Sequence, residues 1–345
     1  MNTNNSSRTI RHAFVTGATG LLGNNLVRAL LKENIEVTAL VRSMDKAKQQ
    51  FDQLPIHLVQ GDILKPESYK DYLADCDSLF HTAAFFRDSH KGGKHWQELY
   101  DTNITGTLDL LQAAYDAGIR QIVHTSSIAV LKGEPNQLID ETMSRDPSTK
   151  IEYYRSKILS DQAVHNFLDK HPDAFITFVL PGSMYGPGDM GPTSTGQMIL
   201  NYMQQKLPGI IKASYSVADA RDVADIHILA MKYGRNRERY LAAGRYMTME
   251  EVMKTLEKVS GIPAPKKRIP MPLLRLFAIW NEIYHFITGK PILVSKDLVE
   301  LFNEEYQRTH FDQTKMKNEL GGQFRPVEET MLDTIKWYRN HGYLS

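Results

Sequence analysis

The amino-acid sequence predicts an α/β fold, in which a doubly wound, parallel Rossmann-type sheet is followed by a smaller, mainly helical C-terminal domain. Short apolar segments alternate with amphipathic segments through the first half of the 345 residues. A glycine-rich turn follows the first apolar segment, and the alternation changes after Pro181. Such alternation builds βαβ units with right-handed crossovers, whose parallel strands are buried on both faces.

Six apolar segments are the predicted strands of this sheet. They cover residues 12–17, 36–41, 56–61, 78–84, 121–127 and 175–182. Between them lie amphipathic stretches, such as residues 21–34 and 105–118, whose apolar spacing is that of helices. We therefore expect helices on both faces of the sheet.

The second half of the chain changes character. We predict a Gly/Pro-rich loop at residues 181–196, a short return to alternation at residues 221–244, and mostly helices after it. The stretch "TMEE" from Thr248 has the spacing of a capping box, which marks one helix start. The predicted first domain covers residues 11–183 with a later return at about 213–245, and the second covers residues 184–212 and 246–345.

Composition narrows the class of protein. Acidic and basic residues nearly cancel to a net charge of +1 and are spread along the chain, so we expect no nucleic-acid partner. The single cysteine, Cys76, excludes an internal disulfide and a Cys-rich metal site, and no metal is predicted. Neither a signal peptide nor an apolar run of about 18 residues is found, so we expect no membrane span and a cytoplasmic protein.

The glycine-rich turn "TGATGLLG" at residues 16–23 follows a strand and opens a helix. Gly17 would allow a tight turn, Gly20 would let the backbone approach a pyrophosphate, and Gly23 would let the helix pack closely on the sheet. The N-terminus of that helix would face the phosphates. The turn therefore predicts a dinucleotide site.

The end of the second strand predicts which dinucleotide binds. A site for NAD usually has an acidic residue there, which holds the ribose 2′-hydroxyl. This chain has Arg42 instead, followed by Ser43, Lys46 and Lys48. A guanidinium suits a 2′-phosphate, and Glu36 lies at the wrong end of the strand. NADPH is therefore the predicted cofactor.

Further motifs are spread along almost the whole chain. They are "GDI" at residues 61–63, "HTAA" at 81–84, "NITGT" at 103–107, "HTSS" at 124–127, "YYRSK" at 153–157, "YGPGD" at 185–189, "ARDVA" at 220–224 and the tail at 315–338. Together with the glycine turn they resemble the extended short-chain dehydrogenases/reductases, and within that group the dihydroflavonol-reductase-like branch. The resemblance implies a nicotinamide-dependent reductase of this fold.

The resemblance also implies the site residues. The family's Y-x-x-x-K motif falls on Tyr153 and Lys157, its strand-end serine falls on Ser127, and Asn103 is implied in a supporting proton relay. The cofactor residues implied by these motifs are Gly17, Thr19, Gly20, Leu21, Leu22, Gly23, Arg42, Lys46, Asp62, Ile63, Thr82, Ala83, Ala84, Tyr153, Lys157, Pro181 and Ser183. The expected substrate residues are Phe85, Phe86, Ser127, Met184 and Tyr185, and the second domain is predicted to bind substrate.

The chemistry explains these residue types. Hydride delivery to a carbonyl carbon leaves charge on the oxygen, so Tyr153 would donate a proton while Ser127 holds the oxygen. Lys157 lies one helical turn after Tyr153 and would lower the pKa of the phenol. In the family the same lysine binds the nicotinamide ribose. The predicted function is thus an NADPH-dependent reductase of a ketone or aldehyde carbonyl in a small, partly apolar substrate.

Two other functions stay open. A nucleotide-sugar epimerase or dehydratase uses the same Ser/Tyr/Lys set, and Arg221 could grip its phosphate, although residues 180–186 lack the asparagine often found there. A non-catalytic, cofactor-sensing regulator would be expected to lack the tyrosine-lysine pair. The oligomeric state is left open, with a homodimer as one candidate.

Several residues have simpler interpretations. His81 and His124 lie in apolar strands and are predicted to be satisfied core residues, and Tyr154 is predicted to pack within its helix. Cys76 shows no catalytic context. The aromatic stretch at residues 273–289 is interrupted by polar groups, so we predict a helix packed in the second domain rather than a surface for a membrane or partner.

Overall fold

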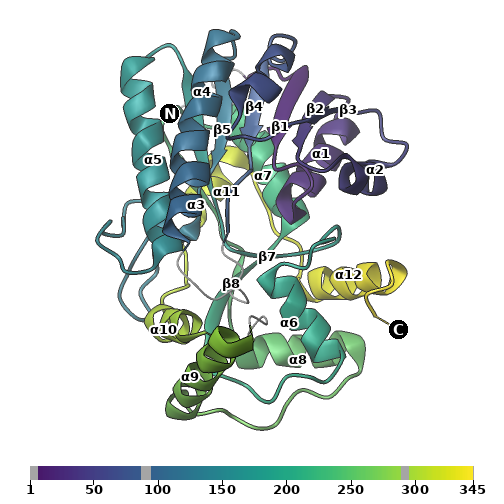
Figure 1. Cartoon of the computed structure of the whole chain (residues 1–345), viewed down its shortest axis with the longest axis vertical. Helices are drawn as coiled ribbons and strands as arrows, with labels where there is room; N and C mark the ends of the chain where they lie inside the picture. Colours follow the sequence, from purple (N-terminus) through teal and green to yellow (C-terminus); the bar gives the residue numbers. More distant parts are fainter. Residues whose placement is uncertain (1–6, 87–94, 289–294, 345) are drawn as a thin grey trace.

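The computed structural model describes residues 7–86, 95–288 and 295–344. A parallel sheet has the strand order β3-β2-β1-β4-β5-β6-β9. Its strands are β1 His12–Thr16, β2 Glu36–Val41, β3 His57–Gln60, β4 Ser78–His81, β5 Gln121–Thr125, β6 Phe175–Pro181 and β9 Arg239–Ala242. All six predicted strands are present, and the doubly wound order confirms the predicted fold class (Figure 1).

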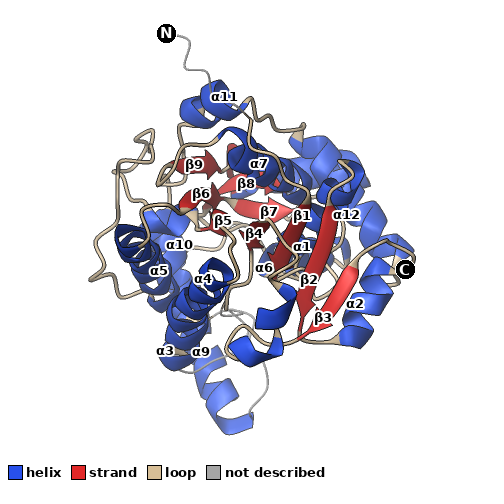
Figure 2. Ribbon diagram, turned by 90° about the horizontal axis from the view of Figure 1, so that it is seen from above, coloured by secondary structure: helices blue, strands red, loops and turns tan. Residues whose placement is uncertain are grey.

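Helices cover both faces of this sheet, as Figure 2 shows. On one face lie α1 Leu21–Lys32, α2 Met44–Phe51, α7 Ala220–Tyr233 and α11 Thr314–Leu320. On the other lie α4 Gly106–Asp116 and α5 Glu152–Lys170, with the short α3 Trp96–Tyr100 beside α5. Ala13 and Val15 of β1 pack in the first core and Phe14 in the second, because successive side chains of a strand point to opposite faces.

A second, smaller sheet supports the C-terminal lobe. It has the order β10-β8-β7, from β7 Ser183–Tyr185, β8 Ser214–Asp219 and β10 Arg245–Thr248. The predicted loop at residues 181–196 therefore contains a strand, and the mainly helical lobe includes a sheet. Gly182 permits this because a Cβ there would lie 2.4 Å from the Ala243 carbonyl oxygen and 2.5 Å from that of Ser216.

The remaining helices belong to this lobe. They are α6 Ser194–Met203, α8 Met249–Ser260, α9 Met271–Thr288, α10 Lys296–Glu305 and α12 Val327–Asn340. The predicted capping box is present, since Thr248 and Glu251 exchange hydrogen bonds at the start of α8. The domain boundaries stay a prediction, but β9 joins the main sheet while β8 joins the smaller one.

Two expectations about single segments have clear outcomes. Cys76 is buried, and burial raises the pKa of its thiol to about 12, which agrees with the lack of a catalytic context in the sequence. The prediction that the aromatic helix α9 packs inside the lobe is wrong for most of its surface. Only Leu274 and Ala278 are buried among its described side chains, while Trp280 is 66% exposed. None of the described helices combines the length and apolar character that crossing a membrane requires.

Candidate active site

The predicted site residues gather where the parallel strands end. Gly17 follows β1, Arg42 follows β2, Thr82 follows β4 and Ser126 follows β5, while Pro181 is the last residue of β6. Because the strands are parallel, their carboxyl ends meet at one edge of the sheet, where open α/β sheets bind ligands. Asp62 and Ile63 follow β3, Ala83 and Ala84 follow Thr82, Thr19 lies in the turn before α1, and Ser183 begins β7.

The three glycines of the first turn differ in whether the fold leaves room for a side chain at their position. Gly17 has φ +68° and would place a Cβ 2.6 Å from the Ala83 nitrogen, and a Cβ on Gly23 would lie 2.2 Å from the Gly17 oxygen. The fold itself therefore requires both. Gly20 has ordinary backbone angles, and its Cβ would meet only the Gly17 oxygen at 3.3 Å. The space beside Gly20 is thus left open by the protein.

The N-terminus of α1 has free hydrogen-bond donors. Gly20 supplies no side-chain cap, and no acidic residue lies in the first turn, which contains Leu21, Leu22 and Gly23. The first N–H groups of a helix have no intrahelical partner and carry partial positive charge. By contrast, α2 is capped by Ser43, which accepts from the Lys46 N–H. The open space and the free donors fit a pyrophosphate.

Hydrogen bonds join the segment after β4 to the end of β1 at this turn. Thr82 donates its hydroxyl to the Thr16 carbonyl at 2.7 Å, and the Ala83 N–H donates to the Thr16 hydroxyl at 3.3 Å. His81 contacts the hydroxyls of Thr16 and Thr107 through its two ring nitrogens, at 2.8 and 2.9 Å. His81 is therefore the satisfied core residue that the sequence predicted.

The end of β2 presents a positive charge to solvent. Arg42 is exposed and, within the described residues, its guanidinium has no ion pair. Glu36 is the first residue of β2 and lies at the opposite end of the strand. Lys46 lies near the loop that contains Asp189. Burial raises the pKa of Asp189, and the positive charge of Lys46 opposes that rise. Arg42 is thus the main cation available at the strand end.

The two tyrosines at the start of α5 point to different surroundings. Ser127 lies close enough to Tyr153 to act on the pKa of its phenol, and the Phe86 ring packs nearly perpendicular to the Tyr153 ring with ring centroids 4.7 Å apart. Tyr154 instead lies under the guanidinium of Arg145, 4.6 Å from its ring centroid. Only Tyr153 faces the serine at the end of β5.

The pKa of Tyr153 moves opposite to expectation. Burial raises it to about 12, although the neighbouring Ser127 acts the other way. We expected Lys157 to lower this pKa, but the lysine Nζ donates to the Thr125 carbonyl at 2.9 Å. Burial in turn lowers the pKa of Lys157 to about 8. At neutral pH the phenol therefore keeps its proton.

A buried carboxylate lies close to Lys157, and the sequence analysis did not identify it. Asp161, one turn after Lys157 on α5, accepts a hydrogen bond from Ser126 at 2.7 Å. Its negative charge opposes the fall in the Lys157 pKa. Burial alone would raise the pKa of Asp161, but His124, Arg239 and Lys157 outweigh it and the pKa is lowered. The acidic residue four positions after the lysine was the available signal.

His124 differs from the predicted satisfied core residue. It is buried, yet neither ring nitrogen has a hydrogen-bond partner among the described residues. Its Nε2 lies 3.5 Å from Asp161 Oδ1, which is an ion-pair distance rather than a well-formed hydrogen bond. Burial lowers the pKa of His124, so the ring is neutral. No group of three or more candidate metal ligands occurs within the described residues.

Asn103 connects the candidate substrate wall to α5. It lies in a single π-helical turn, Asp101–Thr105, of the kind often found at functional sites. Its side chain accepts from the Phe85 N–H at 2.7 Å and donates to the Phe85 carbonyl and the Ser156 hydroxyl, each at 3.0 Å. These contacts occupy the amide, and the proposed proton relay stays a prediction.

The other predicted substrate residues lie in different settings. Phe86 is exposed and Met184 half-buried, whereas Tyr185 is buried and its hydroxyl has no hydrogen-bond partner. The loop after Ala84 was expected to form a pocket wall, and residues 87–94 of that loop lie outside the described residues.

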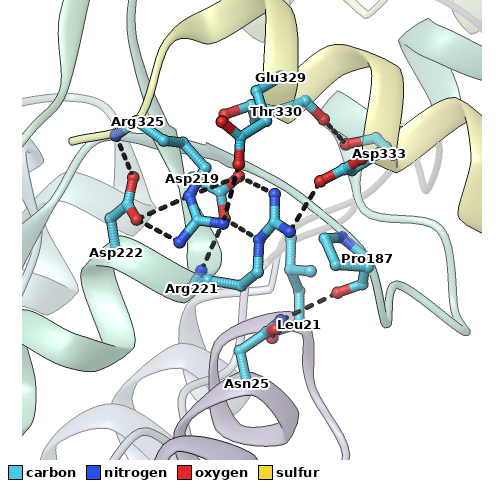
Figure 3. Close-up of polar contacts among 11 residues, drawn as sticks. Leu21, Asn25, Pro187, Asp219, Arg221, Asp222, Arg325, Glu329, Thr330 and Asp333 are labelled. Atoms are coloured by element: carbon cyan, nitrogen blue, oxygen red, sulfur yellow. Dashed lines mark hydrogen bonds and ion pairs between the residues drawn. The ribbon is translucent and has the colours of Figure 1, made fainter.

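The guanidinium of Arg221 is fully engaged in ion pairs (Figure 3). It donates to both carboxylate oxygens of Asp219, at 2.9 and 2.8 Å, and to Asp333 of α12 at 2.8 Å. Arg325 lies beside it and pairs with Asp222 and Asp219. This network holds α12 against α7, so Arg221 is not free to bind a phosphate.

Comparison with known proteins identifies the family. A family model described as "NAD dependent epimerase/dehydratase family" matches residues 13–243. The chain belongs to this family. The match covers the main sheet from β1 to β9, and it confirms the resemblance to extended short-chain dehydrogenases/reductases.

Relatives of known name span nearly the whole chain. A Synechocystis sp. protein named as a dihydroflavonol 4-reductase is 32% identical over 96% of this chain and 95% of its own length. Sterol demethylase protein B of Methylococcus capsulatus is 31% identical over 96% of this chain and 99% of its own length. A ketoreductase of Stigmatella aurantiaca, named for a farnesyl dihydroquinoline oxide, is 31% identical over 94% and 95%. The family and these relatives point to a nicotinamide-dependent oxidoreductase.

Solved structures share the fold. The crystal structure of gox2253 has a TM-score of 0.82 at 27% identity, over 96% of this chain and 99% of that one. More distant neighbours include yeast reductase Gre2 with NADPH, at TM-score 0.73 and 21% identity over 96% and 100% of the two chains. A Bacillus cereus UDP-glucuronic acid 4-epimerase with NAD has a TM-score of 0.76 at 19% identity over 96% and 99%. At these identities the last two neighbours show the fold alone.

Proposed function

We propose that the chain is an NADPH-dependent reductase that transfers a hydride to the carbonyl carbon of a ketone or aldehyde. The observation that carries the proposal is the closeness of Tyr153 to Ser127 just after β5, with Lys157 one turn further along α5. Relatives named as reductases support the same reaction class.

The residues divide the chemistry between them. The cofactor would supply the hydride when bound. Tyr153 has a pKa of about 12 and is therefore protonated at neutral pH, so it can donate a proton to the carbonyl oxygen as charge develops. Ser127 provides a second hydrogen bond to that oxygen. Lys157, with a pKa of about 8, is mostly protonated at neutral pH and would bind the nicotinamide ribose.

The preference for NADPH rests on Arg42. Its exposed guanidinium can bind a 2′-phosphate by two parallel hydrogen bonds, and β2 carries no carboxylate at that end. Removing it in Arg42→Ala should reduce the preference for NADPH over NADH by roughly tenfold to a hundredfold, because a charge-assisted hydrogen bond contributes about 1.5–3 kcal/mol. Steady-state kinetics with both cofactors measure this. An unchanged preference, or a wild type that prefers NADH, would show that Arg42 does not select the cofactor.

A partly apolar substrate is supported by the residues around Tyr153. The Phe86 ring packs against the phenol, and Asn103 binds the backbone N–H of the adjacent Phe85. The nucleotide-sugar alternative loses the phosphate ligand assigned to it, because Arg221 is bound by Asp219 and Asp333. The regulator alternative does not explain why the Ser127-Tyr153 contact is built.

A single assay separates these functions. The wild-type chain is mixed with NADPH and a panel of apolar ketones and aldehydes, and absorbance of the reduced nicotinamide is followed. We expect its loss with at least one carbonyl compound. Interconversion of UDP-sugars without net consumption of NADPH would favour an epimerase instead. Cofactor binding by calorimetry, with no reaction on either panel, would favour the regulator.

A further inference from the structure

Helix α9 presents its apolar side to solvent. Leu273, Leu276, Phe277, Trp280 and Tyr284 are all exposed, and they recur at the spacing of one helical face. Ile279 and Ile283 widen this face. We call these seven residues the α9 face. Figure 1 shows α9 at the end of the C-terminal lobe furthest from the parallel sheet.

The helix is held to the protein by a narrow contact on its other side. Leu274 and Ala278 are buried against Val299 of α10, with Ile211 and Met271 packed around them. The described part of the helix therefore contacts the lobe through its smaller apolar stripe, while no described residue covers the broader one. A contiguous exposed apolar surface of this kind is typical of a binding face.

The charges around this face are strongly biased. Lys266, Lys267 and Arg268 lie shortly before the helix and Arg275 lies in its second turn. All four are exposed, and Arg268 pairs with Glu250. Glu282 is the only acidic residue from 261 to 288. Four cations and one carboxylate give this segment +3, whereas the whole chain has a net charge of only +1. The first turn of the helix contains no acidic residue.

We propose that the α9 face docks the chain on the surface of a membrane that contains anionic lipids. Aromatic and aliphatic side chains with a basic flank are the features of helices that lie in the interface between headgroups and acyl chains. Lysine and arginine near such a surface each add attraction to anionic headgroups. A second copy of the chain fits less well, because a twofold contact between α9 faces would bring two segments of charge +3 together.

Vesicle sedimentation tests the proposal, and it does not depend on the reaction of the chain. Wild-type protein should sediment with vesicles of equal parts phosphatidylcholine and phosphatidylglycerol, and much less with phosphatidylcholine alone. About 1 M NaCl should weaken the binding, because it shortens the Debye length to about 3 Å.

Variants separate the two contributions. Leu276→Gln with Trp280→Gln should weaken binding by roughly tenfold or more, since both change exposed apolar side chains. Lys266→Glu with Lys267→Glu should also weaken it by roughly tenfold or more. Tyr72→Gln is the matched control, because Tyr72 is an exposed aromatic residue of the nucleotide-binding half. Circular dichroism and thermal melting verify that each variant folds.

Fluorescence locates the contact. Trp280 is one of three tryptophans, so its transfer into the lipid interface should shift the emission to shorter wavelength. Trp280→Phe should still sediment but lose most of that shift. A shift that persists in Trp280→Phe would place the contact elsewhere and overturn the proposal.

Two further outcomes would also overturn it. One is wild-type protein that stays in solution with both kinds of vesicle. The other is a Leu276→Gln and Trp280→Gln variant that sediments as well as the wild type. If sedimentation velocity showed a dimer that this variant converts to monomer, and neither form bound vesicles, the α9 face would be an interface between two copies of the chain.

Discussion

Helices α5 and α9 depart from the ordinary burial pattern in opposite directions. In α5, Lys157 and Asp161 are buried, with 3% and 1% of their surface exposed. In α9, Leu276 and Trp280 are exposed. Charged residues are rarely buried in proteins, and an exposed apolar face is equally uncommon.

Both departures work against stability. Moving a charge out of water is unfavourable unless partners compensate it, and apolar surface left in water forfeits about 25 cal/mol per Å². Such features persist in a chain where a ligand, substrate or partner uses them. The comparison therefore links α5 to the proposed reaction and α9 to the proposed docking surface, and each can be tested against a neighbouring residue of the same helix.

The largest expected effect lies on α5. Tyr153→Phe should lower turnover by a factor on the order of 10²–10⁴, because it removes the proton donor while leaving the ring and the affinity for NADPH in place. Tyr154→Phe should be mild, since that ring lies under Arg145 and away from Ser127. Turnover and cofactor affinity are measured for both variants. Equal losses of turnover at the two positions would remove the distinction between the tyrosines.

The next effect compares two leucines of α9. Leu274→Ala should reduce the free energy of unfolding by about 2–5 kcal/mol, because this side chain is buried against α10. Leu276→Ala should change it by no more than about 0.5 kcal/mol, because the side chain is exposed. Urea denaturation monitored by circular dichroism gives both values. A large loss for Leu276→Ala would mean that the α9 face is covered within the folded chain.

The smallest expected effect concerns the Asp161 carboxylate, which lies next to Lys157 on α5. Lys157 has a pKa of about 8, so the rate of carbonyl reduction should fall as pH rises through that value and the ammonium is lost. Asp161 supports the charged lysine, so Asp161→Asn should lower the lysine pKa further and move the fall in rate to lower pH, by roughly one unit.

The control for this experiment is on the same helix. Asp169→Asn changes an exposed carboxylate of α5 that pairs with Arg237, far along the helix from Lys157. Its profile of kcat/KM against pH should match the wild type. A profile for Asp161→Asn that also matched the wild type would show that Asp161 only stabilises the fold around Ser126.

Much of the fold could be predicted because its signals are local. The six strands of the first half were marked by apolar segments of strand length, and the start of α8 by the capping box at Thr248. The strand β7 was missed because "SMY" is short and lies among glycines and prolines, which usually mark loops. Its pairing with β8 depends on residues about 30 positions later in the chain.

Within the candidate site, the sequence predicted residue types better than partners. The sequence predicted that the glycine turn with Gly17, Gly20 and Gly23 joins a strand to a helix. It also showed the spacing of Tyr153 and Lys157. The sequence did not predict that Asp333, 112 positions away, binds Arg221. Nor did the sequence reveal that burial, rather than the nearby lysine, dominates the pKa of Tyr153.

The sequence by itself determined the family, the order of strands and helices in the first half, and the strand ends at which the site residues lie. Periodicity and turn chemistry act over a few residues, so they are visible in the linear chain. Only the tertiary structure decided which carboxylate lies next to Lys157, which carboxylates bind Arg221, and which side of α9 is left in water. These depend on contacts between segments far apart in the chain, because burial and charge compensation are set by what packs around a side chain and not by its sequence neighbours.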